Sequence, residues 1–236
     1  MRIDELTSRE FAEEMARDPV VILPLGATEA HGVHLPLCTD SLQPMAVADM
    51  LAERVDALVA PLVPYGMHSS TLNMPGTIGI SFDTLRALVT DLLSSLVDNG
   101  ATRVVVIAGH AGSSHMTAIK LACQEAVRRM DVRIMFMSDY ELVGPVAKEH
   151  DVDPYDGHAG TMETSRVMAI RPDLVKDHRP EGAYVSHGHQ VLRNPERCFP
   201  RCVAGRPQDS TREMGEEANR CAVNALVGMI ERDWGL

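Results

Sequence analysis

The 236-residue sequence is poor in aromatic residues and in positive charge. Aromatic side chains make up 4% of the chain, and 22 Lys and Arg residues stand against 33 Asp and Glu. The resulting net charge of −11 argues against nucleic acid or an anionic membrane surface as a partner, because both repel an acidic protein. No apolar run approaches the ~20 residues that a bilayer-spanning helix needs.

Cysteine is also scarce and irregularly placed. The cysteines are odd in number and scattered along the chain, which is not the pattern of a disulfide framework: Cys38, Cys123, Cys198, Cys202 and Cys221. Cys198 and Cys202 are close together, but no second pair completes a structural zinc site. The N-terminal stretch MRIDELTSREFAEEMARDP is polar and acidic, unlike a signal peptide. These absences predict a reduced, cytoplasmic protein.

The sequence does contain apolar runs that alternate with amphipathic stretches. We expect strands at 20–26, 57–66, 103–109 and 132–138, and helices at 41–55, 82–99, 114–130, 140–150, 161–170 and 210–231. The segment 177–209 reads only as an irregular, Pro- and Gly-rich region. The alternation predicts an α/β single-domain sandwich over residues 1–236, with a mainly parallel central sheet and helices on both faces.

Acidic residues and histidines follow the expected strands. In "LPLGATEAHGVHLPLCTD", Glu29 and His31 come just after the first strand, and Asp40 precedes a helix. Alternate side chains of an extended chain point to the same side, so Glu29 and His31 can reach one point. His110 follows "VVVIAG" directly. The carboxyl ends of parallel strands form the ligand-binding edge of such a sheet, so we expect these residues to gather there.

His158 and Glu163, in "DGHAGTMETS", open a later helix at the same edge. Histidines and carboxylates brought together in this way match the ligands of Zn²⁺ or Mn²⁺. A proton-transfer site or a merely solvated loop are the alternatives, since a single histidine at a strand end is more often capped or solvated than a ligand. His34 is either a residue that supports the site or an ordinary loop histidine.

The stretches "GATEAHGVHLPLCTD", "NMPGTIGIS", "AGHAGSSH" and "DGHAGTMETS" resemble, in order and spacing, the motifs of the creatininase (creatinine amidohydrolase) family. The resemblance implies an α/β fold, a homohexamer and a binuclear metal centre of Zn and/or Mn, with Fe possible, at two divalent ions per chain. It implies metal-binding roles for Glu29, His31, Asp40 and His110, with Asp40 bridging both ions. It also implies that His158 transfers a proton.

The sequence departs from the family pattern at three points. Creatininase carries a ligand glutamate at the position of Gly112, and Glu163 is the expected replacement, ahead of His115. Creatininase encloses its substrate with tryptophans, whereas this chain has only Trp234. The loop "YGMHSSTLNMPGT" has Ser70, Thr71 and Met74 where the family often has an acidic residue, a histidine and a phenylalanine; these differences point away from creatinine itself as the substrate.

The expected function is hydrolysis of a C–N bond in a small (cyclic) amide through a metal-activated water, with His158 and Glu163 as catalytic residues. Within the family, a formamide deformylase and a small-peptide hydrolase are alternatives, and so is a metal-dependent lyase or sugar-ring hydrolase. A non-catalytic metal-binding protein is a further alternative. His158 argues against it, because a site that only binds metal needs no residue for proton transfer. No G-x-S-x-G motif indicates a serine nucleophile. His187 and His189 receive no role from the sequence, and His115 is the weaker candidate for the missing ligand.

Overall fold

The computed structural model describes all 236 residues and contains a four-stranded parallel sheet in the order β2-β1-β3-β4. The strands are β1 (Val20–Leu25), β2 (Ala57–Val59), β3 (Arg103–Ala108) and β4 (Arg133–Ser138). Every pairing is parallel, which confirms the predicted sheet. The prediction of a strand over 57–66 was too long. Pro61 and Pro64 offer no backbone N–H to a sheet partner, and only isolated bridges follow β2, from Val63 to Leu25 and from Gly66 to Gly79.

The helices are α1 (Ser8–Met15), α2 (Thr39–Ala52), α3 (Phe82–Asp98), α4 (Ser113–Arg129), α5 (Gly144–Glu149), α6 (Thr161–Ile170) and α7 (Arg212–Trp234). The predictions for α2, α3, α4, α6 and α7 are confirmed to within a few residues. Helix α1 was not predicted, although Thr7 and Glu10 form a capping box at its start. The expected helix at 140–150 is a 3₁₀ turn followed by α5, because Pro145 is tolerated only in the first turn of a helix.

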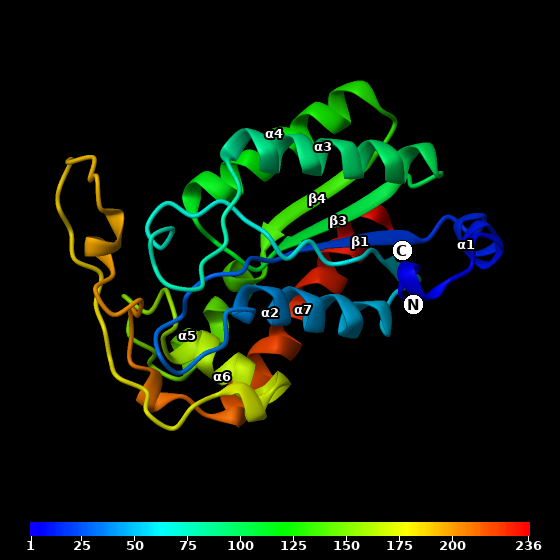
Figure 1. The fold of residues 1–236 in the computed structure, drawn as a ribbon. Helices are drawn as coiled ribbons and strands as arrows, with labels where there is room; N and C mark the ends of the chain where they lie inside the picture. Colours follow the sequence, from blue (N-terminus) through cyan, green and yellow to red (C-terminus); the bar gives the residue numbers. More distant parts are fainter.

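Helices cover both faces of the sheet (Figure 1), and a hydrophobic cluster lies between the sheet and the helices on each face. Val20 and Ile22 of β1 pack with α2 and α7 on one face, whereas Val21 and Leu23 pack with α3 and α4 on the other. All six residues of β1 are buried, as expected for a central parallel strand covered on both faces. Burial of each such side chain contributes about 1.5–3 kcal/mol, so the sheet is a rigid base for the loops at its carboxyl edge.

The segment 177–209 has no helix longer than a 3₁₀ turn, at Pro195–Cys198 and Pro207–Asp209. Figure 1 shows its yellow-to-orange part extending away from the body of the protein; residues 183–201 are called the arm below. An isolated bridge from Gly182 to Gly205 joins the two sides of the base of the arm, and one from His158 to Ala204 attaches this base to the loop before α6. None of the helices combines the length and apolar character that crossing a membrane requires.

Candidate metal centre

Three carboxylates are buried together at the carboxyl edge of the sheet. Glu29, Asp40 and Glu163 are only 2%, 1% and 6% exposed. They line a cavity of about 240 Å³ whose walls include neither lysine nor arginine. Burying several carboxylates away from basic side chains is costly unless protons or cations compensate their charge. The positive charge in this site must therefore come from protonated histidines or from bound metal.

His31 lies between two of these carboxylates. Its Nδ1–H donates to the backbone carbonyl of Glu29 at 3.1 Å, which leaves Nε2 facing Asp40 Oδ1 at 3.0 Å and Glu163 Oε2 at 3.6 Å. Burial alone lowers the pKa of His31, but Asp40, Glu163 and Glu29 outweigh it and raise the pKa to about 10. An unprotonated Nε2 would direct its lone pair at two carboxylates, so this position holds a proton or a metal ion.

His110, immediately after β3, faces the same carboxylates from the other side. Its Nδ1 lies 2.8 Å from Glu29 Oε2 and 3.3 Å from Asp40 Oδ2. Despite burial, Glu29 and Asp40 hold the pKa of His110 well above its ordinary value. The two oxygens of Asp40 thus face two different histidines, Oδ1 towards His31 and Oδ2 towards His110. This is the arrangement that a carboxylate shared by two ions would need.

The donor atoms fit a metal that prefers nitrogen and oxygen ligands. His31, Asp40 and Glu163 form one group whose donor atoms lie within 4.8 Å of one another, and Glu29, His68 and His110 form another. Several of these atoms are buried without a hydrogen-bond partner, among them Glu29 Oε2, His31 Nε2 and Asp40 Oδ2. Imidazole and carboxylate ligands suit zinc and manganese. The residues present therefore fit the metal centre that the sequence predicts.

Glu163 reaches the site from the first turn of α6. Burial raises its pKa to about 7, with Asp40 adding to the rise and His31 opposing it. Its Oε2 accepts the backbone N–H of Ala159 at 2.5 Å. At position 112 a Cβ would overlap Nε2 of His110, so the glycine there permits the observed ring position of His110. Besides that of Asp40, the carboxylate that faces His31 is therefore that of Glu163 in α6, and not one from position 112.

Helix α6 is fixed by buried polar contacts. Gly160 precedes it without a capping side chain, and the Asp156 carboxylate accepts the N–H groups of Thr161 and Met162 at 2.6 and 3.1 Å in its place. A Cβ at Gly160 would overlap the Asp156 carboxylate, so glycine is required there. Further along α6, Arg166 forms a fully buried ion pair with Asp139 at 2.6 Å. These contacts hold Glu163 in place relative to β4.

His158 lies at the wall of the cavity, with its ring 4.2 Å from that of His31. Its Nε2–H donates to the backbone carbonyl of Ala30 at 2.9 Å, which leaves Nδ1 with the lone pair. Burial, together with the neighbouring His31, lowers the pKa of His158 to about 4. At neutral pH this imidazole is therefore uncharged and can accept a proton.

The other histidines that the sequence left open lie outside this carboxylate cluster. His34 is buried, with its Nε2 3.1 Å from the Thr164 hydroxyl. His115 packs its ring against His110 and accepts the N–H of Met67 on Nδ1. His187 and His189 belong to the arm. None of these four is in a group of donors that could hold a metal.

Sequence reasoning missed His68 and the function of Thr71. His68 is 3% exposed and lies beside Glu29, and the Thr71 hydroxyl donates to Glu29 Oε1. Both lie in a loop without helical or strand periodicity, so the sequence did not indicate where these two side chains point. A bridge between Gly66 and Gly79 joins the two ends of this loop. Phe199 from the arm, 5.6 Å from the His158 ring, was also missed.

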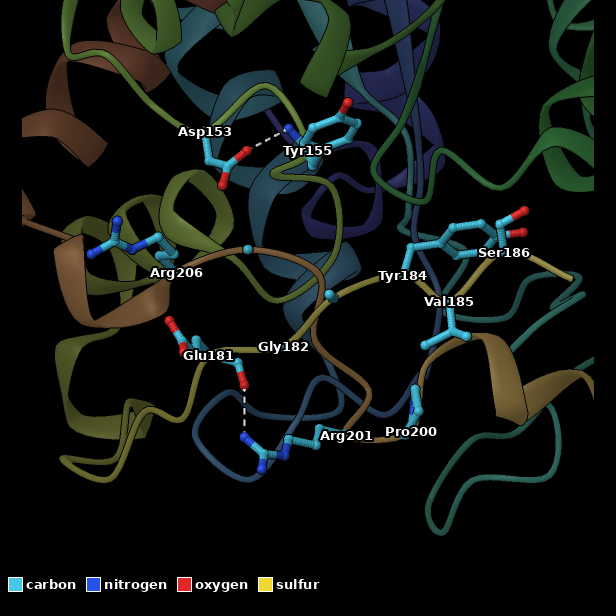
Figure 2. A pocket seen from close by; sticks show the side chains of 12 residues that line it. Asp153, Tyr155, Glu181, Gly182, Tyr184, Val185, Ser186, Pro200, Arg201 and Arg206 are labelled. Carbon is cyan, nitrogen blue, oxygen red and sulfur yellow. Dashed lines mark hydrogen bonds between the residues drawn. The ribbon is translucent and has the colours of Figure 1, made fainter.

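A larger cavity of about 820 Å³ lies between the base of the arm and the loop before α6 (Figure 2). Tyr155, Tyr184 and Arg201 are among its lining residues, and it includes no histidine. Figure 2 shows Arg201 reaching towards Glu181, whose backbone carbonyl accepts a hydrogen bond from it at 3.1 Å. This cavity shares no lining residue with the carboxylate site. Although it is the larger of the two, it lacks the carboxylate and histidine cluster, so we do not assign the reaction to it.

Comparison with known sequences gives a consistent result. Residues 4–230 match the sequence model of the family described as creatinine amidohydrolase. The chain is 34% identical over 200 residues to the creatinine amidohydrolase of Pseudomonas putida, covering 75% of this chain and 76% of that protein. It is 33% identical over 163 residues to the mycofactocin precursor peptide peptidase of Mycolicibacterium smegmatis, covering 66% of this chain and 60% of the relative.

Solved structures agree with the sequence comparison. A creatininase structure described with Mn superposes with a TM-score of 0.88 at 28% identity, covering 98% of each chain. A creatininase mutant of the Zn-Zn type also gives a TM-score of 0.88, at 27% identity, covering 98% of this chain and 97% of that chain. The likeness extends over nearly the whole of both chains, from the sheet to the loops that carry the site.

Proposed function

The chain belongs to the creatininase (creatinine amidohydrolase) family, and from that premise we propose that it is a metal-dependent amidohydrolase. It hydrolyses a carbon–nitrogen bond of a small amide. The observation that carries this proposal is the position of His31 Nε2, which is buried between the carboxylates of Asp40 and Glu163 at 3.0 and 3.6 Å. A divalent cation there would neutralise the carboxylates and use the lone pair that the Glu29 carbonyl leaves free on Nε2.

We propose that the site holds two divalent ions, zinc or manganese, with iron as a further possibility. Glu29 and His110 would hold one ion, His31 and Glu163 would hold the other, and Asp40 would bridge them. The different directions of the two Asp40 oxygens support this division. When bound, two such ions supply hydroxide at neutral pH and polarise a carbonyl group.

His158 is the residue proposed to move protons during the reaction. Its Nε2–H is engaged with the Ala30 carbonyl, so Nδ1 is the atom that accepts a proton from the attacking water. The same atom then returns the proton to the leaving nitrogen, because an amine anion is too basic to depart unprotonated. The low pKa of His158 makes the transfer to the leaving group favourable.

Helix α4 supplies a second contribution to catalysis. Gly112 and Ser113, at its start, line the cavity, and the first backbone N–H groups of a helix have no acceptor within the helix. These N–H groups can donate to the oxygen that becomes negative as the carbonyl is attacked. The positive end of the α4 dipole acts in the same direction.

The cavity favours a compact, uncharged substrate. Its volume of about 240 Å³ is at the small end for ligand sites. Its walls lack the basic residues that would bind a phosphate, and its large aromatic residues are Tyr140 and Phe199. The only tryptophan, Trp234, lies near Arg133 at the end of α7. A small amide that does not require tryptophan stacking is therefore the preferred substrate class.

A short peptide is the second candidate substrate. The similarity to a peptide peptidase at 33% identity supports it. A peptide end would have to pass Phe199 and the arm, whose Tyr184 packs against Phe199 at 5.2 Å.

We also propose that the chain works as one hydrolase domain, as a homohexamer, in the cytoplasm. The homohexamer rests on family membership, and the location rests on the five unpaired cysteines.

The experiment that tests this function combines metal loading with a substrate panel. The purified chain is stripped with a chelator, loaded with Zn²⁺ or Mn²⁺, and assayed with creatinine, N-formyl compounds and short peptides. We expect hydrolysis of at least one class, seen as a new carboxylate or a released amine, only in the metal-loaded protein, and little opening of the creatinine ring. Equal activity of the stripped and loaded protein would contradict the proposal.

A further inference from the structure

His68 is a buried histidine with no assigned role and no hydrogen-bond partner. It is 3% exposed, and neither Nδ1 nor Nε2 has a hydrogen-bond partner. An imidazole buried in this way loses its contacts with water and receives nothing in return. Such an unpartnered group in a native structure points to a ligand that satisfies it.

The surroundings of His68 indicate which ligand this is. Its Nδ1 lies 3.4 Å from Glu29 Oε1, and its ring lies 4.9 Å from that of His110. The donor atoms of Glu29, His68 and His110 all lie within 4.8 Å of one another. Two ligands bound to a tetrahedral zinc ion at about 2.0–2.1 Å are roughly 3.3–3.4 Å apart. The separation of His68 Nδ1 and Glu29 Oε1 matches this value.

His115 provides a contrast within the same structure. Its ring also lies 4.9 Å from that of His110, and it is also buried. However, its Nδ1 accepts the Met67 N–H at 3.2 Å, so that only Nε2 is without a partner, and His115 belongs to none of the donor groups that could hold a metal. Packing against His110 is therefore not enough to bring a histidine to the carboxylates.

We propose that His68 is a metal ligand, binding through Nδ1 the ion that Glu29 and His110 also hold; this rests on the proposed metal centre. With Asp40 as the bridge, the ion on the His68 side has four protein ligands, whereas the ion beside His31 has three. A site with fewer protein ligands keeps a position for water or substrate. The ion beside His68 is thus the more tightly held, and the ion beside His31 is the one that is open to the substrate.

Zinc titration of the full-length, chelator-stripped chain tests this assignment, with His68→Gln compared with His115→Gln as the matched control. We expect the wild type to bind two zinc ions, and His68→Gln to weaken one of them by at least ~10–100-fold. His115→Gln should bind both ions like the wild type. Unchanged binding of both ions by His68→Gln overturns the proposal, and so does an equal loss in both variants.

A different result would show that the proposed metal centre itself is wrong. If the wild type binds no zinc, the proposed function is wrong, and the assignment of His68, which rests on it, is wrong with it. If His68→Gln does not fold, crystals of zinc-loaded wild type decide the question by anomalous diffraction. We expect a zinc peak about 2.0–2.1 Å from His68 Nδ1. Two zinc peaks with His68 Nδ1 beyond bonding distance of both would overturn the assignment.

Discussion

Gly109 lies so close to Asp40 that a Cβ at position 109 would overlap the backbone carbonyl oxygen of Asp40. Gly109 directly follows β3, and Asp40 is in the first turn of α2. The missing side chain therefore lets the start of α2 lie against the end of β3. This close approach brings Asp40 to within 3.3 Å of His110, its distant neighbour in the sequence.

Gly109→Ala is expected to separate these two elements. Forcing a methyl group into a closely packed position costs about 1–3 kcal/mol, and the displacement of Asp40 should also weaken zinc binding. Gly228→Ala in α7 is the control, because no atom lies within 4 Å of its added Cβ, and alanine there should stabilise the helix by about 0.5–1 kcal/mol. Urea unfolding and zinc titration measure both effects. Wild-type stability and zinc affinity in Gly109→Ala would refute this explanation of the site.

His158→Ala is expected to separate catalysis from metal binding. Loss of a general acid–base residue lowers turnover by about 10²–10⁴-fold, while the metal content per chain stays that of the wild type. His150→Ala, which removes a more exposed histidine paired with Glu217, is the matched control and should keep full activity. Retention of both metal and full turnover in His158→Ala would show that another group moves the proton.

Glu163→Gln is expected to remove one ion and leave the other. The amide cannot carry the negative charge that faces His31 Nε2 at 3.6 Å, so the affinity for the ion beside His31 should fall by ~100-fold or more. The ion held by Glu29 and His110 should be retained. Glu149→Gln, at the exposed end of α5, controls for the loss of one negative charge. The idea is wrong if both zinc affinities in Glu163→Gln equal those of the control.

The stability of the metal-free protein is expected to fall as the pH rises above neutrality. The pKa of His31 is raised from 6.5 to about 10 in the folded chain, and the pKa of His110 is raised as well. A group with a raised pKa contributes stability that is complete below its unfolded pKa and is lost as the pH rises towards its folded pKa. Glu163, whose pKa is raised to about 7, is half ionised at neutral pH, and its remaining ionisation lowers the stability in the same direction.

The metal-loaded protein should behave in the opposite way. Zinc binds unprotonated imidazole, so its affinity increases as the pH rises. Between about pH 7 and pH 8, below the ordinary pKa values of cysteine and tyrosine, the melting temperature should fall in excess chelator and should not fall in excess zinc. Parallel curves in the two conditions would mean that protons and metal do not compete for these histidines.

The sequence was sufficient to predict the elements that carry most of the site. The apolar, β-branched run at 103–109 predicted the central strand β3, and the rule for parallel sheets then brought His110 to the same edge as Glu29 and His31. The prediction that 161–170 is helical is confirmed to the residue. These predictions succeeded because periodicity and strand ends are local properties of the chain.

The parts that the sequence did not predict depend on contacts between distant segments. Nothing near His68 in the sequence shows that its loop folds over Glu29. Phe199 contacts His158 from the arm, whose base pairs with His158 through Ala204. The pKa of His158 likewise follows from burial beside His31, which a list of residue types does not contain. Such features need the tertiary structure.

The number of metal ions bound per chain decides whether the buried carboxylates form a binuclear centre. The chain is loaded with Zn²⁺ or Mn²⁺, freed of excess metal and analysed by elemental mass spectrometry, alongside Asp40→Ala. We predict two ions per wild-type chain and the loss of both, or very weak binding of both, in Asp40→Ala. A wild-type chain with no bound ion or only one, or an Asp40→Ala variant that keeps both ions, would contradict the proposed centre.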